Sequence, residues 1–214
     1  MIYNCKKIDN FNDLKSRKDQ VAIFNRKSPK GFNIFFKNLC VSPFSVRGIV
    51  EKNNAEKDIK KLLSPKISER LKKNEFYKNW LLDMSNICKL FCNFKDEKSI
   101  SFWLGTQRGC TRYHVDMVPF RLLVTYAGQG TELLPDHAAN RKAFLEGKPN
   151  EEIVEKRSAL KYLNSWDIAI FRGGKYGMLH RSPDSALNGN SSILMRLDES
   201  SFIDDVRRVN GYKT

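Results

Sequence analysis

Residues 109–128 read GCTRYHVDMVPFRLLVTYAG, and the rest of the chain can be interpreted outward from this stretch. Its two halves, CTRYHVDMV and FRLLVTYAG, are short apolar or alternating runs on either side of a proline, which is typical of two β-strands. In a strand, residues two apart point to the same face, so His114 and Asp116 are expected to project side by side. An imidazole beside a carboxylate can give two ligands to one metal ion.

The strand-like pattern continues toward the carboxyl terminus. Further short apolar runs are SISFWLG (99–105), TELLP (131–135), WDIAIFRG (166–173) and SSILMRLD (191–198). Residues 137–162 interrupt them, and we expect one or two helices there, at a rim where they could form a substrate lid. Strands without helices regularly between them favour a sandwich or barrel over a doubly wound sheet.

The first 97 residues have a different character. Residues 55–94 form a long amphipathic stretch in which apolar residues recur three and four apart, and this pattern predicts helices that face a core. VAIFNRK (21–27) and GFNIFFKNL (31–39) fit either strands or buried loops. We therefore expect one α+β domain over residues 1–214.

Within this domain, a mostly helical, basic lobe (1–97) would support a strand-rich core (98–200). The net charge of +14 is uneven: residues 1–100 carry 22 Lys+Arg against 11 Asp+Glu, and the remaining residues carry 16 against 13. A basic surface can attract nucleic acid. Lysines that alternate with acidic residues along the helical stretch also fit an ordinary solvated surface, so both interpretations stay open.

No apolar run approaches the ~20 residues that a membrane helix needs, so no membrane partner is expected. The polar amino terminus does not fit a signal peptide, and the five scattered cysteines are typical of reduced thiols, so we expect a cytoplasmic protein. Cys88 and Cys92 lie four apart in an apolar helical stretch. They are expected to be buried small hydrophobic residues, because no second pair completes a zinc motif. The oligomeric state stays open.

A third metal ligand has to come from another strand. His180, in GMLHRSP, lies at the edge of a strand-like segment 64 residues beyond Asp116. Two histidines and one carboxylate form the facial triad of non-haem Fe(II) oxygenases. Each part alone also fits a surface histidine beside a solvated aspartate, and the remaining histidine, His137, is expected at the rim. The catalytic and metal-ligand candidates are therefore His114, Asp116 and His180.

The order of these features resembles the Fe(II)- and 2-oxoglutarate-dependent oxygenases. That family shows HxD, a Gly-Gly-Glu-like turn, an apolar strand, a distal histidine and a following arginine, matched here by His114-Val-Asp116, Gly130-Thr-Glu132, WDIAIFRG, His180 and Arg196. The resemblance spans about residues 99–198. It implies a double-stranded β-helix (a cupin-like jelly roll) with amino-terminal helices packed on one sheet. It also implies that Arg196 binds the far carboxylate of 2-oxoglutarate, a role that suits a planar guanidinium.

One position departs from this pattern. Asp198 stands where the family often has Ser or Thr, and a carboxylate there would repel 2-oxoglutarate unless it faces away or the cosubstrate differs. Arg121 and Tyr126, in the strand after HxD, are further candidates for cosubstrate contacts; a surface ion pair and core packing are their alternatives. Cys110 is expected to pack near the site, although it could also approach the metal or act as a redox-sensitive thiol.

The segment GCTRYHVDMVPFRLLVTYAGQGTELLP is also similar to an uncharacterised bacterial family of unknown function, and this similarity extends over most of the chain. The association of that family with zinc homeostasis implies zinc as an alternative to iron, in the open three-ligand geometry of catalytic zinc sites. The leading expectation is an Fe(II)/2-oxoglutarate-dependent oxygenase that hydroxylates an unknown small-molecule or protein substrate. The alternatives are a zinc-binding protein that uses the same ligands and a basic nucleic-acid-binding module.

Overall fold

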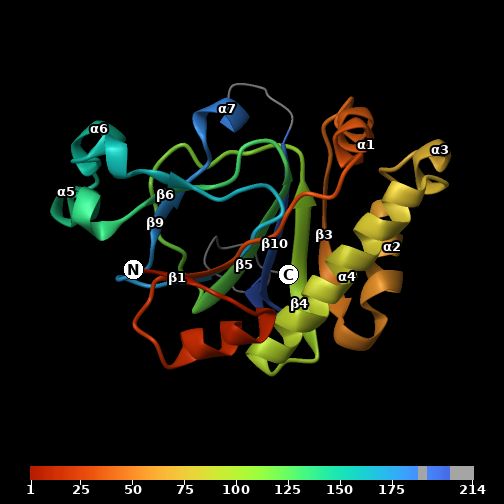
Figure 1. Cartoon of the computed structure of the whole chain (residues 1–214), viewed down its shortest axis with the longest axis horizontal. Helices are drawn as coiled ribbons and strands as arrows, with labels where there is room; N and C mark the ends of the chain where they lie inside the picture. The colour runs from red at the N-terminus through yellow and green to blue at the C-terminus, as the bar shows by residue number, and fades with distance from the viewer. Residues whose placement is uncertain (188–191, 203–214) are drawn as a thin grey trace, which may run out of the picture.

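Two β-sheets carry the architecture in the computed structural model, which describes residues 1–187 and 192–202 (Figure 1). The main sheet has the strand order β1-β2-β8-β5-β10-β4-β3, and the second sheet has the order β7-β6-β9. In chain order, the strands are β1 (Ile2–Asn4), β2 (Val21–Phe24), β3 (Ser45–Glu51), β4 (Ser99–Gly105), β5 (Phe120–Ala127), β6 (Glu132–Leu134), β7 (Lys161–Tyr162), β8 (Ile168–Arg172), β9 (Leu179–Arg181) and β10 (Ile193–Glu199). All pairs are antiparallel except β1 with β2.

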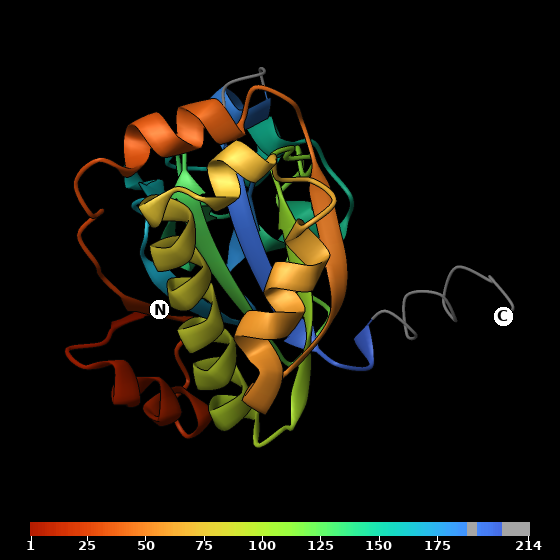
Figure 2. The ribbon, with the colours of Figure 1, turned by 90° about the vertical axis from the view of Figure 1, so that its right-hand side faces the viewer.

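The helices confirm the α+β class. They are α1 (Phe32–Leu39), α2 (Ala55–Leu63), α3 (Glu69–Lys72), α4 (Glu75–Lys95), α5 (Arg141–Leu145), α6 (Asn150–Ile153) and α7 (Asp184–Leu187), with 3-10 turns η1 (Ile8–Lys15), η2 (Lys52–Asn54), η3 (Asp136–Ala138) and η4 (Arg157–Ala159). Figure 2 shows α2 and α4 lying across one face of the main sheet. Within residues 1–187 and 192–202, no helix is both long and apolar enough to cross a membrane.

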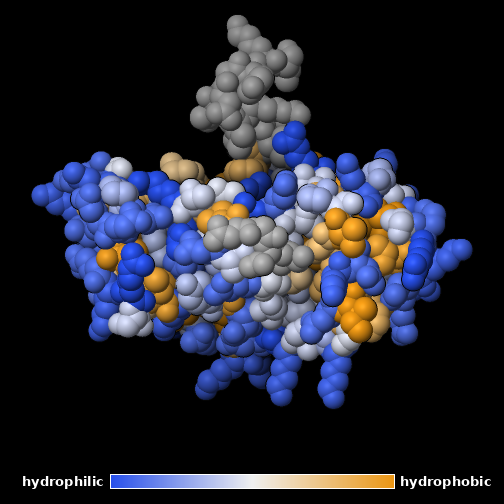
Figure 3. Space-filling model, turned by 90° about the horizontal axis from the view of Figure 1, so that it is seen from above, coloured by the Kyte–Doolittle hydropathy of each residue, from blue (hydrophilic) through white to orange (hydrophobic). Residues whose placement is uncertain are grey.

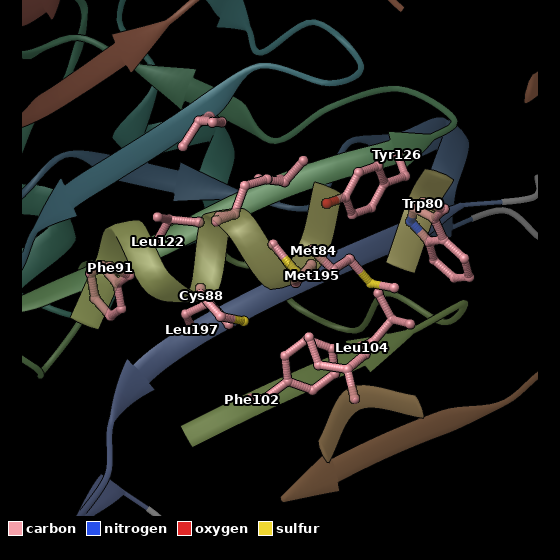
Figure 4. Close-up of a cluster of buried hydrophobic side chains, with 14 of the residues drawn as sticks. Trp80, Met84, Cys88, Phe91, Phe102, Leu104, Leu122, Tyr126, Met195 and Leu197 are labelled. Atoms are coloured by element: carbon pink, nitrogen blue, oxygen red, sulfur yellow. The ribbon is translucent and has the colours of Figure 1, made fainter. Parts of the chain in front are cut away.

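The largest helix, α4, forms the main core together with the sheet. Its amino terminus is capped by the Asn74 side chain, which accepts a hydrogen bond from the backbone N–H of Phe76. Its buried face, which includes Trp80 and Met84, packs against the strands β4, β5 and β10 (Figure 4). Cys88 and Cys92 are fully buried in this cluster, as the sequence predicted for small hydrophobic residues.

The two faces of the main sheet receive alternate residues of each strand. In β5, Leu122 joins the core under α4, whereas Leu123 joins a second cluster that also contains Leu133 of the second sheet. β10 alternates in the same way, with Met195 under α4 and Leu194 in the second cluster. Residues in phase with Leu123 and Leu194 therefore face the space between the sheets.

The amino-terminal half also contributes strands to the main sheet. Val21–Phe24 is the strand β2, which resolves one segment that the sequence left undecided. GFNIFFKNL is neither strand nor loop: it contains the helix α1, because its buried residues recur at helical spacing, at Phe32, Phe35, Phe36 and Leu39. The strands β1, β2 and β3 occupy both edges of the main sheet, so the first 97 residues complete the sheet as well as cover it.

The face of the molecule shown in Figure 3 is largely hydrophilic, in keeping with the high content of lysine and arginine. Hydrophobic side chains gather over the end of the molecule where α1 lies. Ile34 and Val41 are among the exposed hydrophobic residues.

A matched pair of leucine truncations tests this core. Leu122→Ala removes a side chain that is 0% exposed, and it should lower the free energy of unfolding by about 2–5 kcal/mol because a cavity remains. Leu82→Ala, on α4 but 49% exposed, should change it by less than about 1 kcal/mol. Urea denaturation of the metal-free protein measures both, and equal losses would contradict the packing described above.

Candidate metal centre

A β-bridge brings His114 to His180. The backbone N–H of His114 donates to the carbonyl of His180 (3.1 Å), and the N–H of His180 donates to the carbonyl of His114 (3.0 Å). His180 lies in β9, while His114 extends the second sheet through this isolated bridge instead of the full strand predicted for CTRYHVDMV. Directly opposed residues place their side chains on the same face of a sheet, and here the ring centroids are 4.4 Å apart.

Asp116 completes the group that the sequence predicted. Potential ligand atoms of His114, Asp116 and His180 all lie within 4.8 Å of one another. The carboxylate of Asp116 is buried, and its Oδ2 has no hydrogen-bond partner among the described residues. Oδ2 lies 3.7 Å from Nε2 of His180, which is too long for a hydrogen bond. An unpartnered buried carboxylate oxygen is costly, so this arrangement fits a bound cation.

Both histidines are oriented by the same local contact. Nδ1 of His114 lies 3.1 Å from the carbonyl of Arg112, and Nδ1 of His180 lies 2.9 Å from the carbonyl of Met178. A carbonyl only accepts, so each Nδ1 carries a proton, and Nε2 is the ring nitrogen left to bind a metal. Burial lowers the pKa of His180 to about 4, against the opposing effect of Asp116, so this imidazole is neutral at pH 7. Imidazole and carboxylate ligands suit a divalent transition metal.

A chain of alternating charges extends from Asp116 into the main sheet. Arg121 pairs with Oδ1 of Asp116 through one Nη, and its Nε donates to Oδ1 of Asp198 (2.6 Å). Nε of Arg196 lies 3.0 Å from Oδ2 of Asp198 as an ion pair, although the angle does not make a hydrogen bond. Asp198 is thus buried between two arginines. We call Asp116, Arg121, Asp198 and Arg196 the charge ladder.

A pocket of about 280 Å³ opens beside these residues. Its polar wall includes His114, His180 and four arginines: Arg108, Arg121, Arg181 and Arg196. Its apolar wall is formed by Trp103, Leu123 and Leu194. The guanidinium carbon of Arg196 lies 5.6 Å from the ring centre of Trp103, within the range of a cation–π interaction.

Two further residues singled out in the sequence do not join the metal-ligand cluster, and one of them, Tyr126, does not line this pocket. Tyr126 is five residues from Arg121, an odd number, so the two point to opposite faces of β5. The Tyr126 hydroxyl instead donates to Asp83 of α4 (2.8 Å). Cys110 lines the pocket, but within residues 1–187 and 192–202 the metal-ligand cluster comprises only His114, Asp116 and His180.

Residues 137–162 do not cover the pocket, because none of them lines it. They pack instead on the other face of the second sheet, where Ala143 and Ile153 join Leu134 and Leu179. The expectation of a substrate lid is therefore wrong for this structure. His137 is exposed in η3, as expected for a rim residue.

Comparison with known proteins places the chain in a family. The sequence profile of a family described as a protein of unknown function, DUF1826, matches residues 6–198. The chain belongs to this family. The match includes His114, Asp116, His180 and all of the charge ladder. No curated protein matches the chain. Among solved structures, a candidate oxygenase from Shewanella oneidensis matches with 9% identity and a TM-score of 0.39 over 100% of each chain, a similarity too low to support any inference about function.

The backbone around Asp116 is held by a glycine pair that the sequence analysis did not assign to the site. Gly174 donates its N–H to the carbonyl of Asp116 (2.7 Å), and Gly173 donates to the carbonyl of Pro119 (3.0 Å). A Cβ at Gly173 would lie 1.9 Å from the carbonyl oxygen of Val118, so no side chain fits there. The turn FRGGKYG therefore fixes the loop that presents the carboxylate.

Glu132 forms hydrogen bonds with the residues adjacent to both histidines. Its buried carboxylate accepts hydrogen bonds from Tyr113, the neighbour of His114, and from Nε of Arg181 (2.9 Å), the neighbour of His180. The hydroxyl of Tyr162 also donates to it (2.9 Å). Only the Gly-Thr-Glu triplet pointed to this residue in the sequence. Glu132 acts as a positioning residue behind the site.

Loss of one histidine should abolish metal binding. His180→Ala is expected to weaken Mn(II) binding by more than about 100-fold, since even outer-shell changes cost about 10–100-fold at metal sites. His137→Ala, a change at the chain's exposed histidine, should bind Mn(II) like the parent. Isothermal titration measures both affinities, and retained binding by His180→Ala would remove this residue from the site.

The Glu132 contacts should contribute mainly to stability. Glu132→Gln leaves Arg181 paired only with Asp184, so the free energy of unfolding should fall by about 3 kcal/mol. Asp184→Asn removes the partner whose side chain is 70% exposed, and it should cost less than about 1 kcal/mol. Urea denaturation without metal compares them; the reverse order would contradict the assignment of Glu132 as the main partner.

Proposed function

We propose that this protein is an Fe(II)- and 2-oxoglutarate-dependent oxygenase. The observation that carries the proposal is the buried, unpartnered Oδ2 of Asp116 close to two histidines whose Nε2 atoms are free to bind a metal. Arg196 lines the same pocket, as an arginine that binds the cosubstrate must. Two histidines and one carboxylate leave positions on iron for other ligands, which is the requirement of this chemistry.

We propose further that the two sheets form a double-stranded β-helix, with residues 98–200 as the core and residues 1–97 as its support. The strand order supports this fold. From β4 to β10, the chain alternates between main and second sheet: β4, then His114, then β5, then β6 and β7, then β8, β9 and β10. The resulting orders, β8-β5-β10-β4 and β7-β6-β9-His114, are consistent with two interleaved Greek keys and support this proposal.

In this proposal, His114, Asp116 and His180 would hold the iron, and Arg121, which pairs with Oδ1 of Asp116, would leave Oδ2 as the ligand atom. Bound iron(II) would supply the oxidising chemistry, in which O2 and 2-oxoglutarate are consumed, succinate and CO2 are released, and one oxygen atom enters the substrate. Arg196 would bind the far carboxylate of 2-oxoglutarate. Trp103, Leu123 and Leu194 would exclude water from one side of the pocket.

Asp198 does not oppose the cosubstrate in this arrangement. Its two carboxylate oxygens are each paired with an arginine, Oδ1 with Arg121 and Oδ2 with Arg196, and it is 1% exposed. A carboxylate neutralised in this way repels an incoming anion much less than a free one. The departure from the oxygenase pattern at this position is therefore compatible with 2-oxoglutarate.

Anaerobic titration tests the proposal. Addition of Fe(II) and 2-oxoglutarate to the metal-free protein should give a weak metal-to-ligand absorption band near the visible range. Arg196→Gln should lose the band while it still binds Mn(II), and Arg70→Gln, a change at an exposed arginine of α3, should keep it. Absence of the band from the parent, with zinc retained tightly on purification, would instead support a zinc protein that uses the same three ligands.

A further inference from the structure

The four arginines of the pocket differ in whether a neighbouring carboxylate forms an ion pair with them. Arg121 and Arg196 belong to the charge ladder, and Arg181 pairs with Glu132 and Asp184. Arg108 forms no ion pair with a carboxylate among residues 1–187 and 192–202. It is the one pocket arginine in the described part of the chain whose positive charge is not balanced by a neighbouring side chain.

Arg108 is held in place but incompletely bonded. One Nη donates to the hydroxyl of Thr131 (3.1 Å), and the other, Nη1, is buried without any hydrogen-bond partner among the described residues. Burial lowers the pKa of Arg108 to about 10, so the group is still charged at pH 7. A charged donor that is buried without a partner costs free energy, which an anion bound in the pocket would recover.

The position of Arg108 separates it from Arg196. Arg108 lies in the segment between β4 and His114, and its partner Thr131 directly precedes β6 of the second sheet. Arg196 belongs to β10 of the main sheet. The pocket therefore carries two arginines on different structural elements, with His114 and His180 in the same lining.

We propose that Arg108, positioned by Thr131, binds a carboxylate of the molecule that is oxidised at the metal centre, and so determines substrate specificity. This inference rests on the proposed function, since it concerns the substrate of that site. A pocket of about 280 Å³ limits the substrate to a small organic acid or to the acidic end of a larger one. The planar fork of a guanidinium matches a carboxylate with two parallel hydrogen bonds.

Butyrate is a suitable first probe, added to protein saturated with Mn(II) and 2-oxoglutarate. Isothermal titration at constant ionic strength should show butyrate binding to the parent and to Arg70→Gln. Arg108→Gln should weaken it by about 10-fold or more while the affinities for Mn(II) and 2-oxoglutarate stay within about twofold of the parent. Thr131→Val, which removes the hydroxyl that orients the guanidinium, should weaken butyrate binding in the same direction.

The other outcomes separate this inference from the proposed function. Equal butyrate affinity in the parent and Arg108→Gln would overturn it, as would binding of inorganic phosphate in place of butyrate. Loss of 2-oxoglutarate binding in Arg108→Gln but not in Arg196→Gln would overturn it as well, because Arg108 would then be the cosubstrate anchor. If the parent binds no 2-oxoglutarate but Arg108→Gln still loses butyrate, the oxygenase proposal fails and Arg108 remains a carboxylate site.

Discussion

The two backbone hydrogen bonds between His114 and His180 are the constraint on which the candidate site depends. They join positions that are distant in the sequence, and they fix both imidazoles on one face of the second sheet. Because each Nδ1 donates to a carbonyl two residues earlier in the chain, Nε2 is the nitrogen that both rings offer to a metal. The strands around this bridge, the glycine turn at Gly173 and the Glu132 contacts keep it in place.

Burial of charge is the second determinant of the site. Isolated charges in a protein interior are strongly unfavourable, and here carboxylates and guanidiniums alternate so that most charges have a neighbour of opposite sign. Two of the atoms without a hydrogen-bond partner among the described residues are informative: Oδ2 of Asp116 lacks a donor, and Nη1 of Arg108 lacks an acceptor. One of these atoms calls for a cation and the other for an anion, and both belong to the same region of the structure.

The pattern of neighbouring residues in the sequence predicts those parts of the structure that depend on contacts within one short segment. Most of the short strands after residue 98 could be predicted because side-chain alternation in strands is a local property. The face of Tyr126 was predictable by the same rule, from its odd separation from Arg121. The segment around His114 and Asp116 is an exception, since it forms one isolated bridge and not the predicted strand, and the juxtaposition of His114, Asp116 and His180 followed from the order of the motifs. The role of Arg108 and the neutralisation of Asp198 depend on contacts between segments distant in the chain, which one sequence does not encode in any local pattern. For α1, short apolar runs of four to eight residues do not distinguish helix from strand.

The charge ladder connects a cation that binds at Asp116 with a ligand that binds at Arg196. Asp116 shares its charge between Arg121 and whatever cation approaches Oδ2, while Arg121 and Arg196 share Asp198. A cation at Asp116 weakens its hold on Arg121, which strengthens the attraction of Arg121 to Asp198 and leaves more of the charge of Arg196 for a ligand. A cation bound at Asp116 would thus change the affinity of Arg196 for its ligand, and that ligand would change the affinity for the cation by the same factor. This reciprocity holds for any linked pair of sites. If a cation binds at Asp116 and an anion at Arg196, these four side chains therefore couple the two affinities, whichever ligand binds first.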